Sequence, residues 1–350
     1  MKINLRDLSY KKLEEFILNL GEPKFRAKQI YKWLYTDINS IDDMTNISKS
    51  LREKLSETTS VSLPQIEEKF ISAIDETRKY LLKLDDGNYI ESVLMKYKHG
   101  YTICISSQVG CRMGCAFCAS TIGGRIRNLT PSEIIGQVMV VSRDLGERIS
   151  NIVMMGIGEP FDNFENVMTF LSNVSHPDGL NIGHRHITLS TCGIADKIKE
   201  LSHLAPQITL SISLHATNDE MRNSIMPINK KYDIKTVLSA CRDYIRETNR
   251  RISFEYTLIA GVNDNLKTAE ELTKLLSGML CHVNLIPVNA VSETGFKKTD
   301  KKQVEEFRLY LERHKIPATV RREMGSDINA ACGQLRKNRL DRERCDENEG

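Results

Sequence analysis

The sequence of 350 residues lacks the features that mark membrane, secreted and disordered proteins. No stretch approaches the run of about 18 apolar residues that a transmembrane helix requires, so we expect neither a membrane span nor a membrane partner. The first residues become charged again too soon for a signal peptide. Apolar residues make up 40% of the chain and charged residues 27%, which is the composition of an ordinary globular protein and excludes a disordered one.

The chain also lacks a strong charge of either sign, because 49 basic side chains are balanced by 46 acidic ones and the net charge is +3. This excess is too small to indicate a nucleic-acid partner by itself, and it excludes only a strongly acidic chain. There is no internal repeat, no low-complexity run and no pattern of a dimer seam, so we expect a monomer. A chain of this length buries about three quarters of its unfolded surface, which predicts one large core or one core and a small domain.

The nine cysteines argue against a fully paired disulfide framework, since their number is odd. We expect a cytoplasmic protein, and there clustered cysteines indicate metal binding or catalysis more often than disulfides. Three of the cysteines, Cys111, Cys115 and Cys118, stand close together in the sequence. The chemistry of the protein is therefore expected around them.

Residues 1–62 predict a small helical domain. Ser9 is a suitable cap for a first helix that ends at Gly21, Pro23 opens a second, and a third begins near Lys49. The second helix carries a basic cluster, which is compatible with a solvated helix face or with a surface that contacts RNA phosphates. Composition does not decide between these two interpretations.

The rest of the chain predicts an α/β fold. Residues 63–100 alternate apolar and polar side chains around a turn at 85–88, which indicates an antiparallel β extension. Residues 101–322 contain six short apolar runs separated by amphipathic helical segments, the pattern of a parallel sheet curled into a partial (β/α)6 barrel. Residues 323–350 form a polar tail. Active sites of such folds lie at the carboxyl ends of the strands.

The three clustered cysteines have the spacing C-x3-C-x2-C and directly follow the first strand of the predicted barrel. A structural zinc site needs four ligands, usually as two separated pairs, and no fourth ligand is close. Three thiolates on a [4Fe-4S] cluster instead leave one iron open to bind a substrate. This spacing is typical of radical S-adenosylmethionine (SAM) enzymes. We therefore predict that Cys111, Cys115 and Cys118 ligate such a cluster.

Polar and small residues follow the later strands, where a cofactor would bind. Gly158 and Glu159 end the second strand, and glycine lets backbone approach a ligand while a carboxylate can accept an ammonium group. The residues at the ends of the subsequent strands are Ser190, Ser213, Leu214, His215 and Asn289. Each alone could be an ordinary loop residue, but together they predict a ring of SAM-binding residues.

Two cysteines outside the cluster have two interpretations each. Cys104 lies in the first strand and in isolation resembles a small core residue. Cys332 is flanked by small residues in the tail, where it could be either a packed residue or a nucleophile that reaches into a site.

Beyond these patterns, the sequence closely resembles the RlmN-type ribosomal RNA adenine C2 methyltransferases over nearly its whole length. The stretches that carry the resemblance include SSQVGCRMGCAFCAS (106–120), MGIGEP (155–160), SISLHATND (211–219), MPINKKY (226–232) and DINAACGQL (327–335). Their order and spacing follow the family. Asn289 is followed by Ala290 where the family often has proline, and Cys192 is unusual at its position, but no catalytic group is missing.

The resemblance implies the roles of individual residues. Cys111, Cys115 and Cys118 would hold the iron–sulfur cluster, and Gly158, Glu159, Ser190, Ser213, Leu214, His215 and Asn289 would line the SAM site. Cys332 would be the cysteine that is methylated, Cys104 the second catalytic thiol, and Glu91 a general acid/base, although a glutamate in a strand is otherwise an ordinary surface carboxylate.

The resemblance also implies the reaction. One SAM would methylate Cys332, and a second would give the radical that activates the S-methyl group for addition to C2 of the adenine. Cys104 or Glu91 would remove the C2 proton, and Cys104 would release the product by forming a disulfide with Cys332. The implied substrates are adenosine 2503 of 23S ribosomal RNA and adenosine 37 of some transfer RNAs, and a flavodoxin-type protein is the expected reductant.

Two alternatives remain. The Cfr-type enzymes methylate C8 of the same ribosomal adenosine and share these cysteines, which therefore do not discriminate between the two activities. A zinc-dependent RNA-binding module without enzymatic activity is the alternative from another class, and metal analysis would distinguish it.

Overall fold

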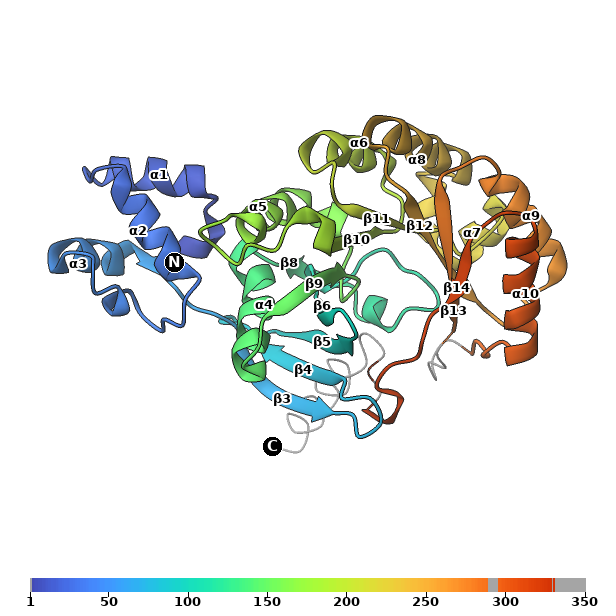
Figure 1. Cartoon of the computed structure of the whole chain (residues 1–350), viewed down its shortest axis with the longest axis horizontal. Coiled ribbons are helices and arrows are strands. Elements are labelled where there is room, and N and C mark those ends of the chain that lie inside the picture. The colour runs from blue at the N-terminus through green and yellow to red at the C-terminus, as the bar shows by residue number, and fades with distance from the viewer. Residues whose placement is uncertain (1, 289–294, 329, 331–350) are drawn as a thin grey trace.

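The computed structural model describes residues 2–288, 295–328 and 330. A single ten-stranded sheet forms the body of the molecule (Figure 1). From one edge to the other its strands are β14 (Ala318–Val320), β13 (Cys281–Pro287), β12 (Ile252–Leu258), β11 (Thr209–Ser213), β10 (Ile187–Thr191), β9 (Ile149–Met154), β6 (Gly100–Cys104), β5 (Tyr89–Tyr97), β4 (Arg78–Lys83) and β3 (Gln65–Ile71). No helix in the described parts of the chain is long and apolar enough to cross a membrane.

The predicted α/β fold is confirmed. The six predicted barrel strands are β6 and β9 to β13, and neighbours among them pair in parallel. The sequence patterns did not predict β14, which adds a short parallel strand beyond β13. On the other side of β6, strands β5, β4 and β3 pair antiparallel, so the β extension continues the sheet of the barrel.

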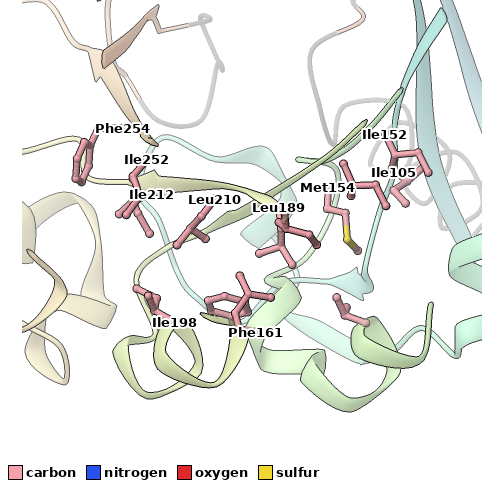
Figure 2. Packing of buried hydrophobic residues seen from close by; sticks show 14 of the residues in the cluster. Ile105, Ile152, Met154, Phe161, Leu189, Ile198, Leu210, Ile212, Ile252 and Phe254 are labelled. Atoms are coloured by element: carbon pink, nitrogen blue, oxygen red, sulfur yellow. The ribbon is translucent and has the colours of Figure 1, made fainter. Parts of the chain in front are cut away.

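Helices between the strands cover one face of the sheet. They are α4 (Pro131–Leu145), α5 (Phe164–Ser175), α6 (Ala195–Leu204), α8 (Ile234–Thr248), α9 (Leu266–Leu276) and α10 (Lys301–Arg313). A shorter helix, α7 (Asp219–Ile225), follows β11 and contributes Ile225 to a separate apolar cluster. Figure 2 shows how strand residues such as Ile152, Leu189 and Leu210 pack with Phe161 and Ile198 in the main apolar core. Alternate residues of each strand point to opposite faces, so the polar residues between these core positions face the interior of the barrel.

The first barrel helix shows why the chain forms helices at these places. Thr130 accepts a hydrogen bond from the backbone N–H of Glu133, and the Glu133 side chain bonds back to the Thr130 N–H, forming a capping box. Pro131 stands at the first turn, where its missing N–H costs nothing. Gly146 ends the helix in the left-handed conformation with φ 73°.

The N-terminal residues have an apolar core of their own, which runs from Leu5 to Val61. Its elements are β1 (Ile3–Asn4), α1 (Tyr10–Asn19), α2 (Phe25–Leu34), α3 (Lys49–Thr58) and β2 (Thr59–Ser60). Asn173 of α5 joins this unit to the barrel, because its side-chain amide donates to the Arg6 carbonyl at 3.1 Å. The carboxylate of Asp7 accepts the backbone N–H of Ser132 at 2.8 Å in the same region.

Candidate functional site

The three clustered cysteines lie in a loop that leaves the carboxyl end of β6. A two-stranded ladder of β7 (Gln108–Gly110) and β8 (Arg125–Asn128) closes the base of this loop, and the Cys111 N–H donates to the Gly124 carbonyl at 3.1 Å. Gly110 has φ +75°, and a Cβ atom there would overlap the Gly124 carbonyl oxygen. Glycine is therefore required at position 110 for the loop to close.

The thiols of the cysteine loop lie in apolar surroundings. Cys111 is buried, and Cys115 and Cys118 are half-buried, beside an apolar cluster that includes Met113 and Met226. Burial raises the pKa of the Cys111 thiol to about 12 and also raises the pKa of Cys115. These thiols are therefore protonated until a metal displaces their protons. Apolar walls and thiol donors suit an iron–sulfur cluster.

Among the described residues, no three Cys, His, Asp or Glu side chains are gathered closely enough to hold a single metal ion. Thiolates that bind different irons of one cluster need not meet at one point, so the spacing of the three cysteines is compatible with a cluster.

Glu159 is buried at the end of β9 and links this strand to the next. Its carboxylate accepts the backbone N–H of Phe161 at 3.0 Å and that of Cys192 at 2.7 Å. Burial raises the pKa of Glu159, and these two backbone donors oppose the shift. No ion pair involves Glu159 in the described parts of the chain. A buried carboxylate with only neutral donors fits an ammonium group, such as that of the methionine part of SAM.

Gly156 and Gly158, the two glycines before Glu159, allow the chain after β9 to lie against the segment that follows β6. A Cβ atom on Gly156 would approach the Ile105 carbonyl oxygen to 2.6 Å. Gly158 has φ +108°, and a Cβ atom there would lie 2.6 Å from Cβ of Gln108. Gly158 was predicted to line the SAM site, and its contact with Gln108 gives glycine a structural reason at this position as well.

His215 follows β11 and connects it to the cysteine loop. Its Nδ1 accepts the Thr257 N–H at 2.9 Å, so the ring proton sits on Nε2. Its ring lies edge-on to that of Phe117 in the cysteine loop, with centroids 4.8 Å apart. Burial, together with the charge of Arg222, lowers the pKa of His215 to about 3, so the ring is neutral at ordinary pH. His215 also has φ 58°, in the left-handed region.

The other predicted SAM-binding residues are on neighbouring strands. Ser190 of β10 pairs with Ser211 of β11, and it is on the opposite face of its strand from the core residue Leu189. Ser213 ends β11, and the N–H of Leu214 donates to the Glu255 carbonyl at 3.1 Å. Asn289 lies outside the described residues, so its position in the site stays a prediction.

Glu91 and Cys104 share one face of the sheet. Cys104 is paired with Val93, and Glu91 stands two residues from Val93 on the same strand. Glu91 is only 2% exposed, and the Lys79 ammonium lies 3.0 Å from its carboxylate. Glu91 is therefore not the ordinary surface carboxylate that a lone strand glutamate suggests. Burial raises the pKa of the Cys104 thiol, and the nearby charge of Arg321 opposes this shift.

The segment after β14 crosses to the far edge of the sheet. In Figure 1 it runs from β14 to the turn between β3 and β4. Asp327 accepts the Ser72 hydroxyl at 2.6 Å and the Ala73 N–H at 2.9 Å, and the Gly325 N–H donates to Asp75 at 2.9 Å. Cys332 lies outside the described residues, and it follows this anchored segment in the sequence.

Sequence reasoning missed two charged residues of the barrel interior. Glu255 of β12 accepts the Ser211 hydroxyl and the Asn284 amide, each at 2.7 Å. A charged residue within the apolar run of β12 was a signal that could have found it. Arg222 of α7 is fully buried behind the strand ends, and no local pattern distinguishes it from an ordinary helix-surface arginine.

A groove on the N-terminal unit combines aromatic and basic side chains. It has a volume of about 500 Å³ and is lined by Phe25, Lys28, Gln29, Lys32, Trp33, Thr36 and Asn46. The side chains of Lys28 and Lys32 are more than half exposed, although both approach the carboxylate of Asp178.

The arginines of the β8 strand have structural partners. Arg127 binds both carboxylate oxygens of Glu133 at 2.7 Å, and Arg125 lies 3.0 Å from Asp162. These ion pairs account for both side chains without RNA.

Comparison with protein families matches two parts of the chain. Residues 3–61 match the model of the ribosomal RNA large subunit methyltransferase N-terminal domain, and residues 105–274 match that of the radical SAM superfamily. The second match contains the cysteine loop and the strand ends through β12.

Individual relatives align over almost the whole chain. A probable dual-specificity RNA methyltransferase RlmN of Clostridium novyi is 55% identical over 96% of this chain and 98% of its own length. A protein of the same description from Clostridium botulinum is 58% identical over 95% of this chain and 96% of its own. A radical SAM methyltransferase from Sphaerobacter thermophilus, known from its crystal structure, has 42% sequence identity to this chain. The two structures superpose with a TM-score of 0.89 over 95% of this chain and 98% of that one.

Proposed function

Because the chain belongs to the RlmN family of radical SAM RNA methyltransferases, we propose that it methylates C2 of adenosine 2503 in 23S ribosomal RNA and of adenosine 37 in some transfer RNAs. Nearly complete alignment with dual-specificity relatives supports two RNA substrates. The observation that carries the proposal is the common face of the sheet on which Cys104 and Glu91 lie, beside the strand ends that bear the cysteine loop.

The cofactor residues of the proposal are those described above. Cys111, Cys115 and Cys118 hold a [4Fe-4S] cluster in the apolar loop, and Glu159 accepts the ammonium group of SAM. Ser190, Ser213, Leu214 and His215, together with Asn289, complete the SAM site. The cluster and SAM together supply the radical chemistry that an electron-poor aromatic carbon requires, and two SAM molecules are used per methyl group transferred.

The chain's own residues carry the methyl group and the proton. The Cys332 thiolate accepts a methyl group by displacement, and this sulfur then links protein and RNA through the methyl carbon. The contacts of Asp327 with Ser72 and Ala73 support this role, because they fix the chain at the edge of the same sheet. Cys332 comes five residues later, and five residues span at most about 18 Å. Cys104 attacks the Cys332 sulfur, which releases the methylated RNA and leaves a disulfide between the two cysteines.

Glu91 is our candidate for the group that accepts the C2 proton. Its carboxylate lies 3.0 Å from the Lys79 ammonium, and both side chains are shielded from water. The buried thiol of Cys104 is the alternative acceptor, but burial raises its pKa and so disfavours the thiolate. The proposal therefore assigns Glu91 as the base and Cys104 as the thiol of the release step.

The N-terminal unit contacts the RNA in this proposal. Phe25 and Trp33 offer flat surfaces on which unpaired bases can stack, and Lys28 and Lys32 can neutralise phosphates in the same groove. The target base must also leave its stack to enter the site, since C2 is hidden in a duplex. Electrons for the cluster come from a flavodoxin-type protein.

Two cysteine variants test the mechanism. Cys332→Ala should retain the iron–sulfur cluster but transfer no methyl group to RNA, because no sulfur remains to carry it. Cys104→Ala should accumulate a covalent protein–RNA adduct, which denaturing gel electrophoresis detects. Cys241→Ala is the control, since this buried thiol belongs to the main apolar core and has no role in the proposed mechanism. Methylation by Cys332→Ala, or full turnover without adduct by Cys104→Ala, would refute the scheme.

A further inference from the structure

Arg222 is a buried cation at the centre of the site. It lies in α7, none of its surface is exposed, and its guanidinium group makes five hydrogen bonds. Nε donates to the Leu214 carbonyl at 3.1 Å, Nη1 to the Asn229 side chain at 2.9 Å and the Tyr232 carbonyl at 3.2 Å, and Nη2 to the carbonyls of Cys192 at 2.7 Å and Ser213 at 3.1 Å. All five acceptors are neutral oxygens.

These hydrogen bonds join two strand ends of the SAM site. Cys192 follows β10 and donates its backbone N–H to the Glu159 carboxylate, while Ser213 ends β11 and Leu214 follows it. One rigid, planar group therefore fixes the separation of the two strand ends. Gly193 makes room for this arrangement, since a Cβ atom there would lie 3.4 Å from Arg222 Nη2 and 2.9 Å from Val237.

The same helix also contacts the cysteine loop. At its end, the Ile225 carbonyl accepts the N–H of Ala116 at 2.9 Å. Met226 follows and belongs to the apolar cluster that contains Cys111. Pro227 lies against Gly114 of the cysteine loop, where a Cβ atom would come within 3.4 Å of the proline ring. The segment from Arg222 to Pro227 therefore connects the SAM strand ends to the loop that holds the three thiols.

The charge of Arg222 has no carboxylate partner within ion-pair distance among the described residues. Asp219 begins the same helix, and its carboxylate accepts the Asn229 amide and the Ile234 N–H, both at 3.0 Å. Burial lowers the pKa of Arg222, and negative charge on Cys192, Cys115 and Asp219 opposes that shift. A buried cation without a carboxylate in direct contact is costly, and thiolate ligands would supply further negative charge.

We propose that Arg222 is a positioning residue that fixes the SAM strand ends relative to the cysteine loop and balances the negative charge of the thiolate-ligated cluster. This inference rests on the cofactors of the proposed function. Three thiolates give the site an excess of negative charge, which grows when the cluster accepts an electron. A fixed cation nearby favours the reduced state and raises the reduction potential.

Two substitutions separate the charge of Arg222 from its hydrogen bonds. Arg222→Lys keeps the charge but cannot span five acceptors, and Arg222→Gln removes the charge as well. Arg308→Gln on α10 is the matched control, because this arginine pairs with Glu305 at the periphery. The cluster is reconstituted anaerobically in each protein. Its midpoint potential is measured by redox titration followed by electron paramagnetic resonance, and the SAM dissociation constant by equilibrium binding.

Both variants of Arg222 should bind SAM at least tenfold more weakly than the wild type. The midpoint potential should fall in Arg222→Gln but stay near the wild-type value in Arg222→Lys and in Arg308→Gln. An unchanged potential in Arg222→Gln, or an equal fall in both Arg222 variants, would overturn the charge role. Unchanged SAM binding in Arg222→Lys would overturn the positioning role. Arg222→Lys is the more conservative variant, so it still tests this role if Arg222→Gln does not fold. A wild-type chain that forms no four-iron cluster would refute the proposed function and this inference together.

Discussion

The buried pair of Lys79 and Glu91 allows a quantitative prediction. Lys79→Met keeps a side chain of similar length and apolar character but removes the ammonium group 3.0 Å from the Glu91 carboxylate. Both side chains are almost fully buried, so water cannot replace the lost partner. Removing one member of a buried ion pair costs about 3–5 kcal/mol, which is a large share of the roughly 5–15 kcal/mol that stabilises a folded protein. We expect Lys79→Met to lower the free energy of unfolding by about that amount.

Urea denaturation followed by circular dichroism measures the effect, with Lys96→Met as the matched control. Lys96 pairs with Glu76 at 2.7 Å near the same hairpin, but both side chains are exposed to solvent, and its removal should change the unfolding midpoint little. The double variant Lys79→Met/Glu91→Leu should recover most of the lost stability, since an apolar pair needs no counter-charge. The account would be contradicted if Lys79→Met lowered the free energy of unfolding no more than Lys96→Met does. It would also be contradicted if the double variant were no more stable than Lys79→Met alone.

Three further predictions concern the cofactor site. Glu159→Gln should weaken SAM binding by about ten- to a hundredfold, because a hydrogen bond to a charged group contributes about 1.5–3 kcal/mol; an unchanged dissociation constant by calorimetry would exclude Glu159 as the ammonium partner. Cys118→Ser should retain less iron and acid-labile sulfide after anaerobic reconstitution than the wild type or Cys241→Ser, and equal contents would exclude Cys118 as a ligand. Burial lowers the pKa of His215 to about 3, so the unfolded chain binds a proton that the folded chain does not, and stability should decline as the pH falls from about 6.5 toward 3. His215→Gln should reduce the part of this decline that the histidine causes, as measured by urea denaturation at several pH values, and an identical pH slope would contradict the assignment.

Much of the fold could be predicted because its signals are local. Each barrel strand is a short apolar run between turn residues, and Thr130, Pro131 and Glu133 mark the start of α4 within four positions. The cysteine loop was equally accessible, since its three thiols lie within eight consecutive residues. The short β14 was not predicted, because three residues give too little periodicity to distinguish a strand from a loop.

The rest of the site depends on tertiary contacts that no local pattern contains. The pairing of β4 with β5 sets Lys79 opposite Val93, which brings the lysine diagonally across from Glu91. A shift of this register by one residue would send the two side chains to opposite faces. Likewise, Arg222 becomes a central residue only because β10 and β11 end beside its helix. Such residues look like ordinary surface charges until the strands are placed.

The position of the new methyl group tests the central claim most directly. Ribosomal RNA that lacks the modification would be incubated with the anaerobically reconstituted enzyme, SAM and a reductant, then digested to nucleosides for mass spectrometry against synthetic standards. The proposed function predicts 2-methyladenosine, and the product should disappear with Cys332→Ala. 8-Methyladenosine would instead assign the C8 activity to the same machinery. An intact cluster that cleaves SAM but forms no methylated adenosine would contradict the proposed substrate.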